Sequence, residues 1–166
     1  MALLFIGFRE DSMEKILISA CLYGHAVRYD GNDNLVTHPF LDKWKKQGRF
    51  VVLCPEVSGG LPTPRPPAEI QADGNVTTIT GNDVTAAFQA GTQTAVKLCR
   101  QHGIKLALMK ENSPSCGSRF IYNGQFDGTK ITGQGLTAAA LTDNGIRVFS
   151  EYQLDELAYA LESLDA

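Results

Sequence analysis

Four short apolar runs recur along the chain, separated by polar or amphipathic segments. They cover residues 15–19, 50–53, 104–109 and 146–150. Runs of this length that lack a polar face are typical of strands buried on both sides of a parallel sheet. We therefore predict that these four segments form the strands of the core.

The segments between these runs have helical or loop-forming patterns. We expect helices over residues 39–47, from 82 or 83 to about 102, and over 135–144 and 154–164, because their composition and spacing fit helices. Asn-Gly and Asp-Gly dipeptides favour a hairpin over residues 120–132. Five prolines and two glycines between residues 55 and 67 predict a long, stiff loop without regular structure. Residues 24–38, rich in Gly, Asn and Asp, predict another loop.

The alternation of strands and helices determines the expected fold class. Strands separated by helices favour right-handed crossovers between parallel neighbours. We therefore expect an α/β fold, a single-domain three-layer sandwich with a mostly parallel, Rossmann-like sheet. Residues 14–166 are assigned to this one domain, and residues 1–13 to an N-terminal extension or an extra strand.

Composition narrows the class of protein and of partner. The chain has 166 residues, 43% of them hydrophobic and 20% charged, with a net charge of −3, so we expect no large nucleic acid as a partner. The apolar N-terminal segment is too short to span a bilayer and has no preceding basic region. We therefore expect a cytoplasmic protein with no membrane partner. The sequence leaves the oligomeric state open.

Cysteines carry the strongest chemical signal in the chain. Cys21, Cys54 and Cys116 each follow one of the predicted strands, and the carboxyl ends of parallel strands meet at one edge of a sheet. Three converging thiolates suit an iron–sulfur centre or zinc, and a missing fourth ligand leaves a position open for chemistry. Alternatively, each is a small buried apolar residue. Cys99 lies within a predicted helix and is interpreted as a core or helix-surface residue.

Several motifs resemble a known family. The motifs are Ser-Ala-Cys-Leu-Tyr-Gly at 19–24, Arg-Tyr-Asp-Gly at 28–31, Cys-Pro-Glu at 54–56, Gly-Gly-Leu-Pro-Thr-Pro-Arg at 59–65, Gly-Asn-Asp-Val-Thr at 81–85, Ser-Pro-Ser-Cys-Gly at 113–117 and Gly-Gln-Gly-Leu-Thr-Ala-Ala at 133–139. Together, and in this order, they resemble the small bacterial family of thiouracil desulfidases. The resemblance extends from residue 14 to about residue 151.

The resemblance implies a cofactor and a reaction. It implies a [4Fe-4S] cluster held by Cys21, Cys54 and Cys116, with one open iron that binds the sulfur of a thiolated pyrimidine. The expected reaction converts 2-thiouracil to uracil and sulfide by hydrolytic desulfuration. Two alternatives stay open: a sulfur-transfer enzyme that inserts sulfur at the same open iron, and a non-catalytic cluster or zinc protein that senses redox state.

Three polar residues near the predicted ligands are candidates for chemistry. Glu56 is the candidate general base or proton shuttle, although it also fits a solvated loop glutamate or a partner of Arg65. Ser113 and Ser115 flank a proline before Cys116, and either hydroxyl suits a role in orienting water or binding substrate. We favour Ser113 for chemistry and expect Ser115 to contact substrate or hold the ligand turn, while both also fit turn caps.

Further candidates for substrate binding lie in the first long loop. The Asp30 carboxylate suits a pyrimidine imide N–H, although an aspartate before Gly31 also fits a turn. Arg28 suits a phosphate or carboxylate, or offsets nearby acids. Tyr29, like Tyr23, suits stacking on a pyrimidine, although such aromatic residues also pack in cores.

Overall fold

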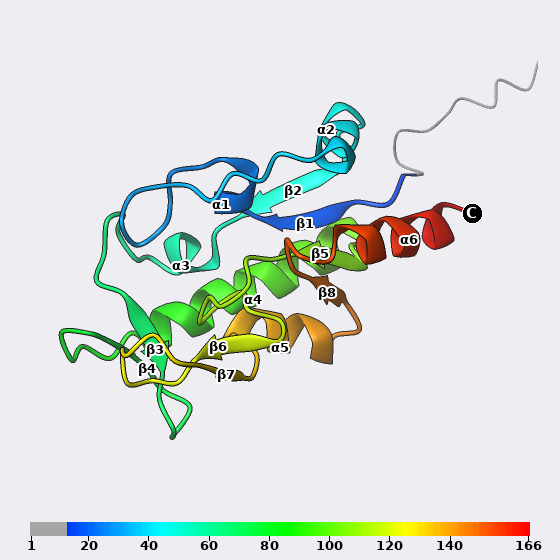
Figure 1. The fold of residues 1–166 in the computed structure, drawn as a ribbon. Coiled ribbons are helices and arrows are strands. Elements are labelled where there is room, and N and C mark those ends of the chain that lie inside the picture. The colour runs from blue at the N-terminus through cyan, green and yellow to red at the C-terminus, as the bar shows by residue number, and fades with distance from the viewer. Residues whose placement is uncertain (1–12) are drawn as a thin grey trace, which may run out of the picture.

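A four-stranded parallel sheet forms the centre of the computed structural model, which describes residues 13–166 (Figure 1). Its strands are β1 (Ile16–Ser19), β2 (Phe50–Leu53), β5 (Leu106–Leu108) and β8 (Arg147–Phe149), in the order β2-β1-β5-β8. Ile16 of β1 pairs with Phe50 on one side and with Leu106 on the other. The expected α/β class with a parallel sheet is confirmed, and the four apolar runs form the four strands.

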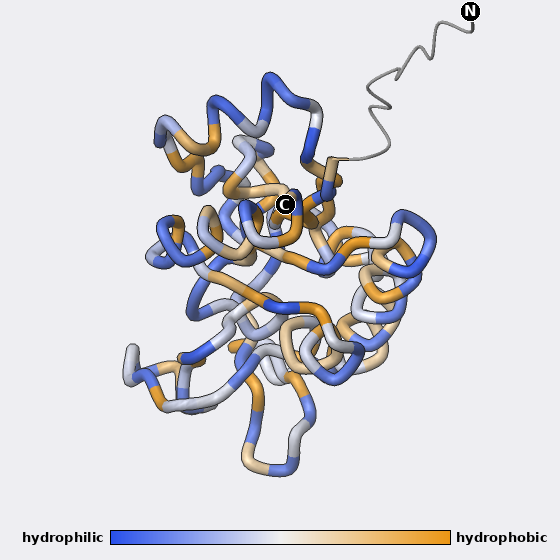
Figure 2. The backbone as a smooth tube through the Cα atoms, turned by 90° about the vertical axis from the view of Figure 1, so that its right-hand side faces the viewer, coloured by the Kyte–Doolittle hydropathy of each residue, from blue (hydrophilic) through white to orange (hydrophobic). Residues whose placement is uncertain are grey.

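Helices cover both faces of the sheet. The helices α2 (Pro39–Lys46) and α6 (Leu154–Asp165) pack on one face, and α4 (Thr85–His102) and α5 (Leu136–Asp143) pack on the other. The side chains of successive β1 residues therefore point to opposite faces of the sheet. Ile16 and Ile18 belong to the core under α2 and α6, whereas Leu17 belongs to the core under α4 and α5. Figure 2 shows hydrophobic stretches running through the middle of the molecule and hydrophilic ones at many outer turns.

Two small antiparallel hairpins lie outside the central sheet. One joins β3 (Ala68–Ile70) to β4 (Val76–Thr78), and the other joins β6 (Phe120–Tyr122) to β7 (Lys130–Thr132). Both hairpins lie at the same end of the molecule in Figure 1, where β3 contacts β6. The hairpin expected over residues 120–132 is present. The sequence reasoning did not identify the β3–β4 hairpin, although Asp73-Gly74, with Gly74 at φ 86°, is a hairpin-forming dipeptide.

Two one-turn helices begin where β1 and β2 end. They are α1 (Ala20–Tyr23) and α3 (Pro55–Ser58). The expectation that no regular structure occurs between residues 55 and 67 is therefore wrong at its start. Pro55 occupies the first helical position, where its fixed φ favours a helix and its missing N–H needs no partner. The other prolines of this segment lie beyond the helix.

The N-terminal expectation concerns residues that are almost all outside the described range. The expected extension or extra strand covers residues 1–13, and the structure describes the chain from residue 13 onward. Within residues 13–166, no helix is both long and apolar enough to cross a membrane.

Candidate active site

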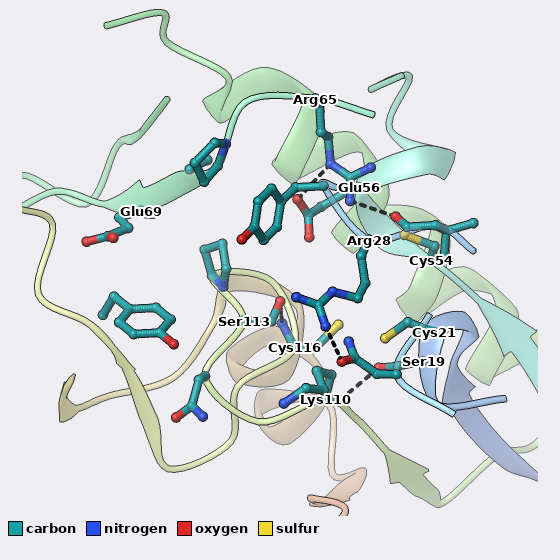
Figure 3. Close-up of a pocket in the computed structure, with 18 of the residues that line it drawn as sticks. Ser19, Cys21, Arg28, Cys54, Glu56, Arg65, Glu69, Lys110, Ser113 and Cys116 are labelled. Carbon is teal, nitrogen blue, oxygen red and sulfur yellow. Dashed lines mark hydrogen bonds and ion pairs between the residues drawn. The ribbon is translucent and has the colours of Figure 1, made fainter. Parts of the chain in front are cut away.

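A cavity of about 530 Å³ opens beyond the carboxyl ends of β1, β2 and β5, and three cysteines line it. Cys21 lies in the first turn after β1, Cys54 directly follows β2, and Cys116 lies in the loop after β5. The three strands are neighbours in the sheet, so segments far apart in the sequence bring their thiols to one place. Figure 3 shows the three side chains around a common space, with Glu56 and Ser113 beside it.

The environment of the three thiols disfavours their ionisation. Burial raises the pKa of Cys116, and the neighbouring Cys21 and Cys54 raise it further. Burial also raises the pKa of Cys21 and of Cys54. Because cysteine binds metals as a thiolate, a positively charged centre that binds here must displace protons from the thiols.

The donor set suits a cluster of iron and sulfide. Three thiols are the soft ligands that iron–sulfur clusters take from proteins. A cubane cluster is larger than a single ion and offers each thiolate a different iron atom. The three thiols and the cavity that they share therefore fit a [4Fe-4S] cluster.

Glu56 lies at the cavity wall with one carboxylate oxygen fixed. Its Oε1 accepts a hydrogen bond from Arg65 Nε at 3.2 Å, and the arginine is itself anchored by donating to the Val27 carbonyl oxygen at 3.0 Å. Burial raises the pKa of Glu56, and Arg65 acts in the opposite direction. Glu56 thus pairs with Arg65 and also lines the cavity, where its Oε2 accepts no hydrogen bond from residues 13–166.

Ser113 and Ser115 have different surroundings. The Oγ of Ser113 accepts hydrogen bonds from the backbone nitrogens of Ser115 and Cys116, both at 3.1 Å, and Ser113 lines the cavity. Ser115 is fully buried, with its Oγ 2.9 Å from Thr137 Oγ1, and does not line the cavity. Ser113 therefore holds the turn before Cys116, the role that the sequence reasoning offered to Ser115. The burial of Ser115 does not fit a contact with substrate.

The buried carboxylate of Glu111 joins the two ends of the loop that carries Cys116. Glu111 is 3% exposed, and its Oε1 accepts hydrogen bonds from the backbone nitrogens of Ser118, Arg119 and Phe120 at 3.0, 3.1 and 3.2 Å. Burial alone would raise the pKa of Glu111, but these donors outweigh it and lower the pKa below its ordinary value. One charged oxygen thus ties the start of the loop to its end.

Only some of the substrate-binding candidates in the first long loop line the cavity. Arg28 and Tyr29 line the cavity, and Arg28 Nη1 donates to Asn34 Oδ1 at 2.8 Å. Asp30 does not line it: this exposed side chain accepts from the Asn32 backbone nitrogen and pairs with Arg28 at 3.3 Å. The turn interpretation of Asp30 therefore fits its position.

The alternative stacking candidate, Tyr23, and Cys99, which was predicted to be a core or helix-surface residue, both lie away from the cavity. Tyr23 packs edge-on against Phe50 and carries Lys45 over its ring. Cys99 is buried in the core under α4 and α5, where burial raises its pKa to about 11. Neither residue lines the cavity.

Several cavity residues were not identified from the sequence. Lys110 follows β5 and lies in the cavity wall, with its Nζ 3.1 Å from Glu151 Oε2. The two hairpins contribute Glu69, Tyr122 and Phe126. Lys110 directly follows a predicted buried strand, and this position could have identified it as a cavity residue. The hairpin residues had no such signal, because their approach to the cavity depends on how the hairpins pack together.

Comparison with known proteins identifies the family. The family described as 2-thiouracil desulfurase matches residues 16–153. The uncharacterized protein YbbK of Bacillus subtilis (strain 168) is 40% identical over 154 residues, which span 86% of this chain and 99% of that protein. A solved structure of "[4Fe-4S]-dependent thiouracil desulfidase TudS" is 54% identical, with a TM-score of 0.88, and the match covers 90% of this chain and 98% of the other. The resemblance noted in the sequence is confirmed: the chain belongs to the 2-thiouracil desulfurase family.

Proposed function

We propose that this protein is a [4Fe-4S]-dependent thiouracil desulfidase. The observation that carries the proposal is the convergence of Cys21, Cys54 and Cys116 on one cavity that also contains the partly free carboxylate of Glu56. Membership of the 2-thiouracil desulfurase family and the 54% identity to a desulfidase of this name support it. The proposed substrate is 2-thiouracil or a related thiolated pyrimidine.

The three cavity cysteines are the proposed cluster ligands. Three thiolates satisfy three of the four irons of a cubane cluster, which leaves the fourth iron without a protein ligand. Held by these three residues, such a cluster would supply a soft Lewis acid for the sulfur of the substrate, which would make the ring carbon more electrophilic. The fourth cysteine, Cys99, is a buried residue of α4 that does not line the cavity and is not a candidate ligand.

The reaction is a hydrolysis in which no atom changes its net oxidation state. A C=S bond of the pyrimidine is broken and a C=O bond is formed, with the oxygen and two protons supplied by water. The products are uracil and hydrogen sulfide. The protein must therefore take both protons from water and pass them to the departing sulfide.

Glu56 is the proposed group that moves these protons. Its Oε1 is held by Arg65 at 3.2 Å, which fixes the direction of the carboxylate. Its Oε2 accepts no hydrogen bond from the described residues and is the proposed acceptor of the proton from the attacking water. Removing the bulk solvent around this carboxylate raises its pKa and makes it a stronger base once ionised.

Ser113 is the proposed hydrogen-bond donor beside the reacting atoms. Its Oγ already accepts two backbone N–H groups, so its own hydrogen is available to donate into the cavity. A donor at this point orients either the water or a heteroatom of the ring. Ser113 thus combines two roles, since the same oxygen holds the turn that carries Cys116.

Arg28 and Tyr29 are the proposed substrate-binding residues of the first loop. Asn34 and Asp30 hold the guanidinium of Arg28, so its position is set before substrate binds. Asp30 then acts on the site through Arg28 and not by contact with substrate. The Tyr29 ring, 44% exposed beside the cavity, offers a face for the heterocycle.

Reconstitution under anaerobic conditions tests the proposal. The protein is incubated with iron and sulfide, desalted, and assayed for iron, visible absorbance and sulfide released from 2-thiouracil. We expect about four irons per chain and stoichiometric formation of uracil and sulfide. A cluster-loaded protein that releases no sulfide, or that only inserts sulfide into an acceptor, overturns the proposal. We also propose the cytoplasm as its location, because a solvent-accessible cluster needs a reducing compartment.

A further inference from the structure

Glu69 lies across the cavity from Cys21 and Cys54 (Figure 3). It is a carboxylate of β3 that is only 8% exposed. Its Oε1 accepts hydrogen bonds from the backbone nitrogens of Gly124 and Phe126, at 3.0 and 3.1 Å. Both donors belong to the turn between β6 and β7, so this side chain fastens one hairpin to the other.

The contact between the hairpins is close and has further support. Gln71 Nε2 donates to the carbonyl oxygen of Gly124 at 3.1 Å. A Cβ at Gly124 would lie 2.8 Å from the backbone oxygen of Ile70, and its φ is 90°. Only glycine fits this position without displacing one hairpin from the other.

Phe126 is held in a backbone conformation that its side chain disfavours. Its φ is 55°, in the left-handed region, which bulky side chains rarely adopt. Such a conformation persists only where surrounding contacts support it, and the hydrogen bond to Glu69 is one such contact. The result is that Phe126 lines the cavity together with Tyr122.

The cavity therefore has two unlike ends. The thiols, Glu56 and Ser113 form a polar end that follows the strands of the sheet. The hairpin end carries the aromatic residues Tyr122 and Phe126, and its carboxylate, Glu69, is hydrogen-bonded to the turn between β6 and β7. Ile79, which follows β4, adds an apolar side chain. A flat heterocycle with one reacting sulfur matches this division, because its sulfur needs the thiol end while its ring gains from an aromatic surface.

We propose that Phe126 forms the aromatic wall that binds the ring of the substrate, and that Glu69 is the positioning residue that holds this wall in place. The proposal rests on the proposed function for the identity of the substrate. It assigns ring binding to the hairpins and leaves the reaction itself to the residues at the strand ends. Its consequence is that disturbing the wall weakens substrate binding without slowing the chemical step.

Kinetics of cluster-loaded variants test this separation. Phe126→Ala is expected to raise KM for 2-thiouracil about tenfold, equal to about 1.4 kcal/mol, and to leave kcat within about twofold. Glu69→Ala and Gly124→Ala should raise KM in the same direction, because each releases the turn. Glu69→Gln should keep the wild-type KM, since its amide oxygen still accepts from Gly124 and Phe126.

Phe120→Ala is the matched control. It removes the same side chain from the same hairpin, at a 43% exposed position that does not line the cavity, and should leave KM unchanged. A wild-type KM in Glu69→Ala or Phe126→Ala overturns the proposal. So does a Glu69→Gln variant as impaired as Glu69→Ala, because the charge would then matter more than the position of the turn.

Uracil binding measured by calorimetry separates this proposal from the proposed function. We expect uracil to bind about tenfold more weakly to cluster-loaded Phe126→Ala and Glu69→Ala than to wild type. If the wild-type protein binds uracil but releases no sulfide, the desulfidase assignment fails while the binding comparison still tests the wall. If the wild-type protein neither binds uracil nor releases sulfide, both proposals are wrong.

Discussion

The Oγ of Ser113 lies 3.1 Å from the backbone nitrogen of Cys116 and accepts its hydrogen bond. The same oxygen accepts from the backbone nitrogen of Ser115. Through these two bonds one hydroxyl sets the turn that points the Cys116 thiol into the cavity. Ser113 therefore affects the proposed cluster through the backbone. Its hydroxyl group can also act on any substrate that binds beside it.

Replacing Ser113 with alanine should loosen the cluster. Each lost hydrogen bond costs about 1 kcal/mol, so Ser113→Ala should lose iron to a chelator several times faster than wild type and release sulfide more slowly. Ser113→Thr keeps the oxygen and should restore the rate of iron loss. Equal iron-loss rates for Ser113→Ala and wild type would show that these bonds do not hold the ligand turn.

The four cysteines should divide into two groups under substitution. Cys21→Ser, Cys54→Ser and Cys116→Ser should each lose bound iron, visible absorbance and activity, because each removes one proposed ligand. Cys99→Ala should keep all three properties, since Cys99 is 2% exposed in the core under α4 and α5. Full iron content in any one of the three serine variants would exclude that cysteine as a required ligand.

Glu111 should stabilise the fold in a pH-dependent way. Its pKa is lowered in the folded protein, so the folded state favours the ionised carboxylate. This contribution is complete above the pKa of the unfolded chain, about 4.3, and is lost as the pH falls through the folded-state pKa. Urea unfolding at pH 7 should show Glu111→Ala to be less stable by about 1–3 kcal/mol.

Glu111→Gln separates the charge of this residue from its geometry. Its amide oxygen still accepts from the backbone nitrogens of Ser118, Arg119 and Phe120, so this variant should lie between wild type and alanine at pH 7. The stability gap between wild type and Glu111→Gln should narrow as the pH falls below 4. A gap that widens in acid would contradict the lowered pKa.

Much of the fold follows from local pattern, and the exceptions have local causes. Three of the apolar runs form the neighbouring strands β1, β2 and β5 that deliver the thiols. β1 and β5 are buried throughout, whereas β2 at the edge of the sheet is only partly buried, and in each case a continuous apolar run marks the strand. The proline-rich segment predicted a loop, and α3 was not predicted, because a proline at the first position of a helix cannot be told from a helix breaker in the sequence. The β3–β4 hairpin has only three residues in each strand, too few for a clear alternation.

The candidate site was predictable only where it follows the sheet. Cys54 and Glu56 lie at a strand end, where sequence order fixes position. The roles of Ser113 and Ser115 depend on which hydroxyl turns toward the cavity, and sequence does not give side-chain direction. The turn that carries Phe126 contacts Glu69, 57 positions away in sequence, so no local pattern contains this relationship.

Glu56 should matter for turnover more than for cluster binding. Glu56→Gln keeps the oxygen that accepts from Arg65 Nε but cannot take a proton from water. We expect kcat to fall about 100-fold or more, with iron content unchanged and KM close to wild type. Glu156→Gln, an exposed position on α6, is the control and should match wild type. A small effect on kcat would assign the proton transfer to another group.

Gly91 of α4 permits the close approach of the one-turn helix α3. A Cβ at Gly91 would lie 1.8 Å from the backbone oxygen of Pro55, and one at Gly59 would lie 2.0 Å from the backbone oxygen of Ala87. Neither collision is with a flexible side chain, so the two helices must separate to admit a methyl group. Since Cys54 directly precedes Pro55, any such separation must move a proposed cluster ligand.

Gly91→Ala should therefore lower both stability and cluster retention. Alanine favours a helix interior by about 1 kcal/mol over glycine, so any net loss must come from the collision with Pro55, which we expect to cost about 1–3 kcal/mol or more. Thermal unfolding and iron loss to a chelator measure the two effects. Gln93→Ala, at an exposed position of the same helix, should leave both within error. A Gly91→Ala variant with wild-type iron retention would mean that α3 can shift without moving the Cys54 thiol.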